Sequence, residues 1–386
     1  MSTLLFWGAL AAIAYAYVLF PLLVLLRGRL WSRPFAQGDI TPHVSIIVAA
    51  HNEESSIGGK IQNMLLLDYP ADRLEVIVAS DGSSDDTENI VRRFGDKGIR
   101  LLSLPRRGKA HAMNAAVATS RGDILVFSDA NSMYGSGAVR ALVRPFADPT
   151  VGGVAGDQRY LDDSSAAITA DGERAYWDFD RMLKEAQSQA GNVTSATGAI
   201  YAIRRSLFSP VPEGVTDDFV TSTNVIAQGC RLVFAPAAVA FEPVARSGGV
   251  EFGRKVRVIT RGFQSVLVMR TLLNPFRYGF YAIQLFSHKV VRRLVALPLL
   301  VLLAGSVVLW NDGPLYGTIA VGQLMLYSCA VLGIALSRTR FGRKKILTLP
   351  LFFVAVNVAA LMAAFKLLFG QRVVMWDPQR PQSPVS

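Results

Sequence analysis

The feature that most constrains this chain is the position of its long apolar segments, which lie at its two ends. Leu4–Leu26 is a run of about 23 mostly apolar residues without a charged side chain, long enough to cross a bilayer as a helix. Arg27, Arg29 and Arg33 follow at once. Basic residues are retained on the cytoplasmic side of membranes, so this segment is predicted to end inside the cell. The competing interpretation, a secretory signal, would need a basic start and a shorter apolar run.

The second apolar region occupies residues 294–368. Leu294–Trp310 and Leu315–Leu336 are apolar and are separated by a short polar turn, which predicts a hairpin of two spanning helices. A basic loop then returns the chain to the inside. The last apolar segment, Ile346–Leu368, has basic residues at both ends, so the region is predicted to contain two to three spans.

Residues 246–291 mix basic and apolar side chains at helical spacing, which is typical of amphipathic helices in the membrane interface. The net charge of +11 gathers beside the apolar segments rather than in a stripe with aromatic residues, so nucleic acid is not an expected partner. Cys230 and Cys329 are too far apart to indicate a disulfide framework or a metal site. The tail, residues 377–386, is rich in Pro, Gln and Ser and is predicted to be disordered.

The middle of the chain, residues 40–245, has the pattern of one α/β domain. Short β-branched runs alternate with amphipathic segments, which is typical of a mostly parallel sheet covered by helices on both faces. Ligands of such sheets bind beyond the carboxyl ends of the strands. Strands are predicted at Val44–Ala50, Leu74–Ser80, Ile99–Leu104 and Ile124–Ser128, and helices near Glu53–Leu66, Asp85–Phe94 and Lys109–Thr119.

Acidic and amide side chains lie at the ends of two of these predicted strands. Asp81 ends one strand ahead of a turn through Gly82, where a carboxylate could accept hydrogen bonds from a nucleobase. Asp129 and Asn131 follow another strand. Residues i and i+2 of an extended segment point the same way, so both could bind one Mg²⁺ or Mn²⁺ that bridges nucleotide phosphates. Ordinary turn and cap formation is the structural alternative for each cluster.

Two further clusters carry opposite charges. Asp217 and Asp218 open a predicted helix, whose dipole favours their ionised form, and an ionised carboxylate could remove a proton from an attacking hydroxyl. Arg106, Arg107 and Lys109 follow a strand and open another helix, where cations and backbone N–H groups could bind a diphosphate. Helix capping and a solvated basic turn are the structural alternatives here.

These clusters occur in a recognisable order. The motifs are His51-Asn52-Glu53-Glu54, Asp81-Gly82-Ser83, Arg107-Gly108-Lys109 with Asn114, Asp129-Ala130-Asn131 and Asp217-Asp218. As a set they resemble glycosyltransferase family 2 over about residues 40–290. With its apolar flanks, the chain looks like the membrane-bound branch that contains cellulose, hyaluronan and poly-N-acetylglucosamine synthases. The resemblance implies a GT-A (Rossmann-like) domain between transmembrane and interfacial helices.

The resemblance also implies roles for matching residues. Glu53, Asp81, Lys109 and Asp129 would bind the nucleotide, Asp129 and Asn131 the metal ion (Mg²⁺ or Mn²⁺), Arg257 the diphosphate, Thr197, Gly198 and Asp217 the acceptor, and Asp218 would be the catalytic base. Two departures from the family pattern matter. Asn131 replaces a charged metal ligand by a neutral one, which implies weaker metal binding. Val258 stands where processive synthases have a tryptophan, which favours limited transfer over long-chain synthesis.

The leading hypothesis is an inverting glycosyltransferase in a bacterial inner membrane, with its catalytic domain in the cytoplasm. It would move a sugar from a nucleotide-sugar, by default UDP-linked, to a lipid-linked or membrane-associated glycan in exopolysaccharide or envelope assembly. Other polysaccharide-assembly proteins would be its further partners. The alternatives are a processive synthase that also translocates its polymer and a non-catalytic nucleotide-binding scaffold.

Overall fold

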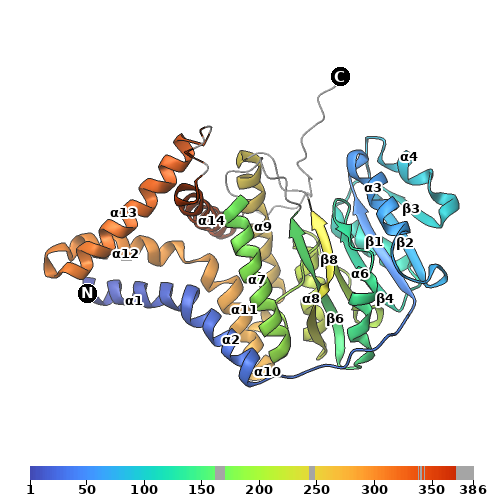
Figure 1. Cartoon of the computed structure of the whole chain (residues 1–386), viewed down its shortest axis with the longest axis horizontal. Helices are drawn as coiled ribbons and strands as arrows, with labels where there is room; N and C mark the ends of the chain where they lie inside the picture. Colours follow the sequence, from blue (N-terminus) through green and yellow to red (C-terminus); the bar gives the residue numbers. More distant parts are fainter. Residues whose placement is uncertain (161–169, 243–247, 338, 340, 343, 371–386) are drawn as a thin grey trace. The chain divides into compact units, whose positions relative to one another are not determined.

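A computed structural model gives the fold of the chain. It describes residues 1–160, 170–242, 248–337, 339, 341–342 and 344–370. These residues divide into two compact units. We call residues 28–160 and 184–242 the sheet unit, and residues 1–27, 170–183 and 248–370 the helical unit (Figure 1). The predicted disordered tail lies outside the described residues.

The sheet unit contains one eight-stranded mixed sheet with the strand order β3-β2-β1-β4-β7-β6-β8-β5. β1 (Val44–Ala50), β2 (Leu74–Asp81), β3 (Ile99–Leu104) and β4 (Ile124–Asp129) are parallel to one another. β7 (Tyr201–Arg204) is antiparallel to β4 and to β6 (Val151–Tyr160); β8 (Arg231–Glu242) is parallel to β6 and antiparallel to β5 (Met133–Tyr134). The four predicted strands begin at their predicted residues, whereas β5 to β8 were not predicted.

The helices of the sheet unit connect these strands. They are α3 (Glu54–Leu65), α4 (Thr87–Arg92), α5 (Lys109–Thr119), α6 (Ala138–Val143) and α8 (Asp217–Ala227), with 3₁₀ turns η2 (Ala71–Arg73), η3 (Gly95–Lys97), η4 (Arg144–Ala147) and η5 (Arg205–Leu207). Every residue of β1 is buried, as expected for a central parallel strand covered on both faces. Its side chains join Ile57 and Ile61 of α3 in the main hydrophobic core.

The helical unit is almost entirely α-helical. It contains α1 (Ser2–Ala14), the π-helical η1 (Tyr15–Leu19), most of α2 (Phe20–Leu30), the first part of α7 (Ala170–Ala190), α9 (Gly248–Val268), η6 (Arg270–Leu273), α10 (Pro275–Tyr278), α11 (Phe280–Lys289), η7 (Val291–Arg293), α12 (Ala296–Val308), η8 (Trp310–Asp312), α13 (Pro314–Ala335) and α14 (Lys345–Leu368). The boundary between the units falls within α2 and α7.

Three helical segments among the described residues are long and apolar enough to cross a membrane: Ser2–Leu30, Pro314–Ala335 and Lys345–Leu368. Large apolar side chains on α13 remain exposed, as on Met325 and Ile334, which suits contact with lipid. The last segment, whose topology the sequence left open, is one continuous helix despite Pro350.

The expected span at Leu294–Trp310 differs in the structure. Its helix, α12, has only 13 residues, and it reaches spanning length only together with Phe280–Arg293, to which it is bent by 55°. Pro298 lies in the first turn of α12, where a residue without a backbone N–H is tolerated but cannot continue a helix from before it. Part of the predicted interfacial region, α11, therefore belongs to a bent helix pair.

Candidate functional site

The acidic and polar clusters lie at one edge of the sheet. In the strand register, Ala50 at the end of β1 pairs with Ser80 of β2, and Ala49 pairs with Asp129 of β4. Because parallel strands end at the same edge, the segments that follow β1, β2 and β4 meet there. We call this the carboxyl edge of the sheet.

The loops after β1 and β2 are fastened together through Asn52. Its backbone is left-handed, with a φ of 53°, a conformation that residues other than glycine, asparagine and aspartate seldom adopt. The Asn52 side-chain oxygen accepts a hydrogen bond from the backbone N–H of Ser84 (2.8 Å), and its backbone N–H donates to the Ser83 hydroxyl (3.1 Å). These two bonds support the conformation and fix one loop to the other.

Glu53 is buried just behind that turn, with 2% of its surface exposed. Its carboxylate accepts a hydrogen bond from the Ser56 hydroxyl (2.7 Å), while its backbone N–H donates to the Thr87 hydroxyl (2.7 Å). Glu53 therefore joins the start of α3 to the start of α4. Its predicted contact with a nucleotide stays a prediction.

Asp81 is fully buried, and the loop that follows β3 surrounds its carboxylate. The Arg106 guanidinium donates to it at 2.9 Å, and the backbone N–H groups of Arg107 and Gly108 donate at 2.8 and 2.9 Å. Gly82 allows the approach: its φ is +60°, and a Cβ there would lie 2.7 Å from the Arg106 nitrogen. Asp81 thus shapes the loop that leads into Lys109, and its predicted contact with a nucleobase stays a prediction.

Lys109 joins two acidic clusters that are far apart in the sequence. Its ammonium donates to Asp129 Oδ1 (2.7 Å) and lies 2.9 Å from Asp217 Oδ2. Burial opposes the charge of Lys109, but the attraction of the two carboxylates outweighs it and raises the pKa above its ordinary value. Lys109 is therefore a permanent cation that links the end of β4 to the start of α8.

Asp218 follows Asp217 in the first turn of α8. Its Oδ1 accepts a hydrogen bond from the backbone N–H of Phe219 (2.7 Å). The structure thus brings together four of the predicted site residues: Lys109, Asp129, Asp217 and Asp218.

The donor set at Asp129 fits a divalent cation. Asp129 and Asn131 offer oxygen ligands, and Mg²⁺ needs only one or two carboxylates when substrate phosphates complete its shell. Gly198 lies against Asp129: a Cβ there would be 2.9 Å from Asp129 Oδ2, so the missing side chain leaves room over that oxygen. No group of three His, Cys, Asp or Glu side chains in the described ranges could hold an ion by itself.

Arg257 and Thr197 are the remaining predicted site residues. Arg257 lies on α9 in the helical unit, so the sheet unit by itself does not contain the expected diphosphate contact. Thr197 precedes Gly198, and its hydroxyl is buried and has no hydrogen-bond partner among the described residues.

Sequence reasoning missed a buried cation behind Asp129. Lys60 of α3 has no exposed surface, donates to the carbonyl of Ser132 and lies 3.9 Å from the centre of the Tyr134 ring. The Ser132 hydroxyl in turn donates to Glu242 at the end of β8. Burial lowers the pKa of Lys60 to about 7, although Asp129 and Glu242 oppose that shift. An isolated lysine inside an amphipathic helix gives no sequence signal of this kind.

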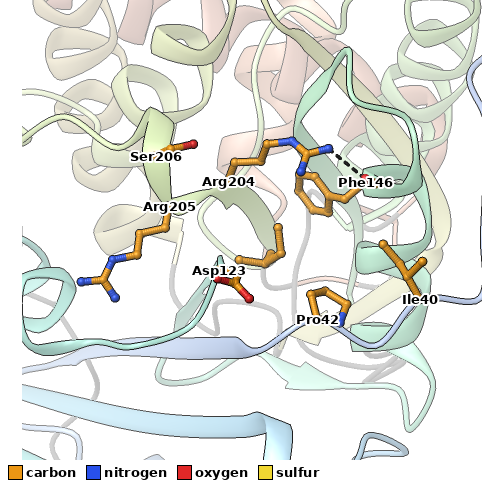
Figure 2. A pocket seen from close by; sticks show the side chains of 8 residues that line it. Ile40, Pro42, Asp123, Phe146, Arg204, Arg205 and Ser206 are labelled. Atoms are coloured by element: carbon orange, nitrogen blue, oxygen red, sulfur yellow. Dashed lines mark hydrogen bonds between the residues drawn. The ribbon is translucent and has the colours of Figure 1, made fainter.

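A cavity of about 520 Å³ lies at the opposite edge of the sheet, which we call the amino edge (Figure 2). Arg204 and Arg205 line it, but both guanidinium groups are used within the fold. Arg204 donates to the carbonyls of Val151, Phe146 and Asp148, at 2.8, 2.8 and 3.0 Å, and Arg205 donates to the carbonyl of Ser120. This cavity lies away from the acidic clusters. The guanidinium groups of Arg204 and Arg205 donate to backbone carbonyls, which favours a structural role for both side chains.

Comparison of the sequence with known protein families supports the sheet arrangement described above. Residues 45–211 match the family model described as Glycosyl transferase family 2. Residues 45–211 therefore form a domain similar to glycosyltransferase family 2. The matched segment, which we call the family 2 domain, runs from β1 to beyond η5 and includes Asp81, Lys109, Asp129 and Gly198.

Two curated relatives and one solved structure support the match. The protein named "Probable glycosyltransferase YdaM" of Bacillus subtilis (strain 168) is 30% identical over 252 residues, 61% of this chain and 58% of that protein. Poly-beta-1,6-N-acetyl-D-glucosamine synthase of Staphylococcus aureus (strain COL) is 24% identical over 249 residues, 63% of this chain and 60% of that protein. The alignments thus span about three fifths of each relative.

One similar solved structure is that of a mannosyltransferase from Pyrobaculum calidifontis, PcManGT, in complex with GDP-Man and Mn²⁺. It is 26% identical to this chain, with a TM-score of 0.71, and the match covers 95% of this chain and 100% of that one. These comparisons confirm the predicted GT-A fold of the family 2 domain.

Proposed function

We propose that this chain is an inverting glycosyltransferase that takes sugar from a nucleotide-sugar. The observation that carries the proposal is the contact of Lys109 with both Asp129 and Asp217. One buried cation connects the oxygen ligands suited to a metal–diphosphate complex with the acid pair suited to proton removal. A donor bound at Asp129 would therefore lie next to an acceptor bound at Asp217 and Asp218.

The nucleotide-sugar would bind at the carboxyl edge of the sheet. Glu53 and Asp81 support the loops that would receive the nucleotide, and Lys109 would supply positive charge for the diphosphate. The contact of Arg257 with the diphosphate stays a prediction. Asp129 and Asn131 would hold Mg²⁺ or Mn²⁺. The chemistry that a bound ion supplies is neutralisation of charge on the diphosphate. Binding of GDP-Man and Mn²⁺ by PcManGT is compatible with this arrangement.

The reaction would be a single displacement at the anomeric carbon. Asp218 accepts the proton of an acceptor hydroxyl while that oxygen bonds to the anomeric carbon. The bond between that carbon and the diphosphate breaks, and its electron pair leaves with the nucleoside diphosphate. Lys109 stabilises the negative charge of this leaving group. Because one displacement inverts the carbon, an α-linked donor gives a β-linked product.

The acceptor would be a lipid-linked or membrane-associated glycan. Three helices of spanning length favour a site at a membrane, and Arg27, Arg29 and Arg33 favour a cytoplasmic family 2 domain. The similarity to a poly-beta-1,6-N-acetyl-D-glucosamine synthase supports a second candidate, processive synthesis. The absence of an aromatic side chain at Val258 favours limited addition.

Substitution of the base tests the activity. The purified full chain in detergent would be incubated with UDP- and GDP-sugars, an acceptor lipid extract and Mn²⁺, and nucleoside diphosphate release would be measured. We expect Asp218→Asn to lower turnover at least about 10³-fold while leaving nucleotide binding nearly intact. Asp72→Asn, at an exposed acid in η2, is the matched control. Wild-type turnover by Asp218→Asn would reject the assignment of the base.

Product length separates the two candidate activities. Radiolabelled donor would be supplied in excess, and the products would be resolved on a gel. Limited transfer predicts short products whose length does not grow with time, whereas a continuous ladder of long products would support the processive alternative.

A further inference from the structure

Tyr201 is a buried aromatic residue of β7 that lies against the proposed site. None of its surface is exposed, and its ring stacks on Phe127 of β4 with the ring centres 4.8 Å apart and the planes at 17°. The two residues are direct partners in the antiparallel register. Phe127 and Asp129 are two positions apart on β4 and point to the same face of the sheet, so Tyr201 shares that face with Asp129.

The hydroxyl of Tyr201 has no hydrogen-bond partner among the described residues. Thr221 of α8 is in the same situation: it is 2% exposed and its hydroxyl is also unpaired within the described part of the chain. A side-chain interaction with Thr221 lowers the pKa of Tyr201, so the two hydroxyls are neighbours, although neither makes a hydrogen bond of good geometry among the described residues. Thr221 is one helical turn after Asp217, on the same side of α8.

The surroundings of the Tyr201 hydroxyl are strongly acidic. Burial raises the pKa of this phenol well above its ordinary value, and the negative charges of Asp217, Asp218 and Asp129 raise it further, while Thr221 opposes the shift. Tyr201 therefore keeps its proton under all ordinary conditions. It therefore remains a hydrogen-bond donor within electrostatic reach of three carboxylates.

A buried hydroxyl without a partner is costly, so its presence calls for an explanation. A phenylalanine at position 201 would preserve the stacking on Phe127 and remove that cost. The hydroxyl thus adds nothing to the packing that the structure describes. A donor function toward the neighbouring carboxylates would account for it.

We propose that Tyr201 is a positioning residue whose hydroxyl donates a hydrogen bond to Asp217 when Lys109 engages the diphosphate of the donor. This inference rests on the proposed function. Lys109 serves both Asp129 and Asp217, and a diphosphate would compete for the same three N–H donors. Tyr201 then replaces Lys109 at Asp217, which keeps the start of α8 in place and holds Asp218 toward the acceptor.

Tyr201→Phe tests the inference through stability, turnover and pH dependence together. We expect the melting temperature of the purified full chain to rise, because the variant lacks an unpaired buried hydroxyl. We expect kcat to fall on the order of 10-fold with the KM of the nucleotide-sugar nearly unchanged. The acidic limb of the kcat profile should move to higher pH, because loss of a donor destabilises the carboxylate form of the acid pair.

Tyr69→Phe is the matched control. The Tyr69 hydroxyl donates to the carbonyl of Pro42 at 2.6 Å, at the amino edge of the sheet. Its removal should lower the melting temperature and leave kcat and the pH profile unchanged, which is the opposite pattern. Thr221→Val should resemble wild type in kcat, because the proposal gives its hydroxyl no contact with Asp217.

Each readout can overturn the inference. A lower melting temperature for Tyr201→Phe would show that the hydroxyl has a structural partner. Wild-type kcat and an unshifted acidic limb would show that it does not act on the acid pair. The Asp218→Asn variant separates failure of the proposed function from failure of the role proposed for Tyr201. If that variant turns over normally, the base is wrong, whereas an inactive Asp218→Asn together with a fully active Tyr201→Phe rejects only the role of Tyr201.

Discussion

The two edges of the sheet use cations in different ways. At the carboxyl edge, Lys109 is bound by two carboxylates, Asp129 and Asp217. At the amino edge, Arg204 is bound by the backbone carbonyls of Val151, Phe146 and Asp148; Figure 2 shows the contact with Phe146. Both cations bind partners within the sheet unit.

The difference indicates which edge is built for exchange of partners. A carboxylate–ammonium contact can be replaced by contacts of either group with a charged ligand, because a diphosphate or a metal ion offers equivalent charge. Backbone carbonyls have no such substitute, and leaving several of them unpaired in the interior is costly. We therefore expect substitutions at the carboxyl edge to change activity most, and those at the amino edge to change stability most.

The largest effect is expected for Lys109→Met. Loss of the cation removes charge stabilisation of the leaving diphosphate, so kcat/KM for nucleotide-sugar should fall about 10²–10³-fold. Lys97→Met, at an exposed position of the same domain, is the control and should behave as wild type. Unfolding by denaturant should be followed in parallel, because Asp129 and Asp217 lose their shared partner. Wild-type kcat/KM in a folded Lys109→Met chain would contradict the exchange model.

Arg204→Met should give the complementary result. Three carbonyls lose a charged donor, so the free energy of unfolding should fall by about 2–4 kcal/mol. Where the variant folds, kcat and KM should stay at wild-type values. Arg121→Met, at an exposed side chain, should change neither quantity. A strong fall in kcat without a loss of stability would show that the amino edge also takes part in the reaction, contrary to this expectation.

Gly198→Ala sharpens the description of the carboxyl edge. The added Cβ would lie 2.9 Å from Asp129 Oδ2, so the carboxylate must shift and Mn²⁺ should bind about 10-fold more weakly. Titration of Mn²⁺ in the presence of nucleoside diphosphate, followed by electron paramagnetic resonance, measures this directly. Gly137→Ala, where a Cβ meets nothing within 4 Å, should bind Mn²⁺ as wild type does. Equal affinity in both variants would place the ion elsewhere.

The smallest effect concerns Lys60 and pH. Its pKa is lowered from 10.5 to about 7 in the folded protein, so between these values the unfolded chain binds more protons. Stability must therefore rise with pH through this window, by about 1 kcal/mol between pH 7 and pH 8. Denaturant unfolding of wild type and Lys60→Met at both pH values measures this. A Lys60→Met chain with the same rise would assign it to another group.

The first half of the sheet was predictable because its strands follow simple rules. β1 and β4 are apolar and rich in β-branched residues, and α5 between them begins and ends at the predicted residues. β6 was missed because it contains Gly152, Gly153 and Gly156, which disfavour a strand assignment. Their role is steric: a Cβ at Gly152 would lie 2.4 Å from Leu207. Packing across the sheet, which a local pattern does not record, decides that segment.

The candidate site was predictable as a set of positions but not as a set of contacts. The positions of Asp81 and Asp129 at strand ends follow from local sequence, since both end apolar runs. The bridge from Lys109 to Asp217 spans more than one hundred residues and depends on β7 entering the sheet antiparallel beside β4. The same arrangement places Tyr201 on Phe127, so neither contact could be inferred before the strand order was known.

The left-handed backbone at Asn52 limits how freely this edge of the molecule can vary. A side chain at this position must tolerate a positive φ and also accept a hydrogen bond from Ser84. Aspartate meets both conditions, glycine only the first, and valine and isoleucine neither. In a library that randomises the loop after β1, functional clones should therefore contain few residue types at position 52, although its side chain lies at the surface.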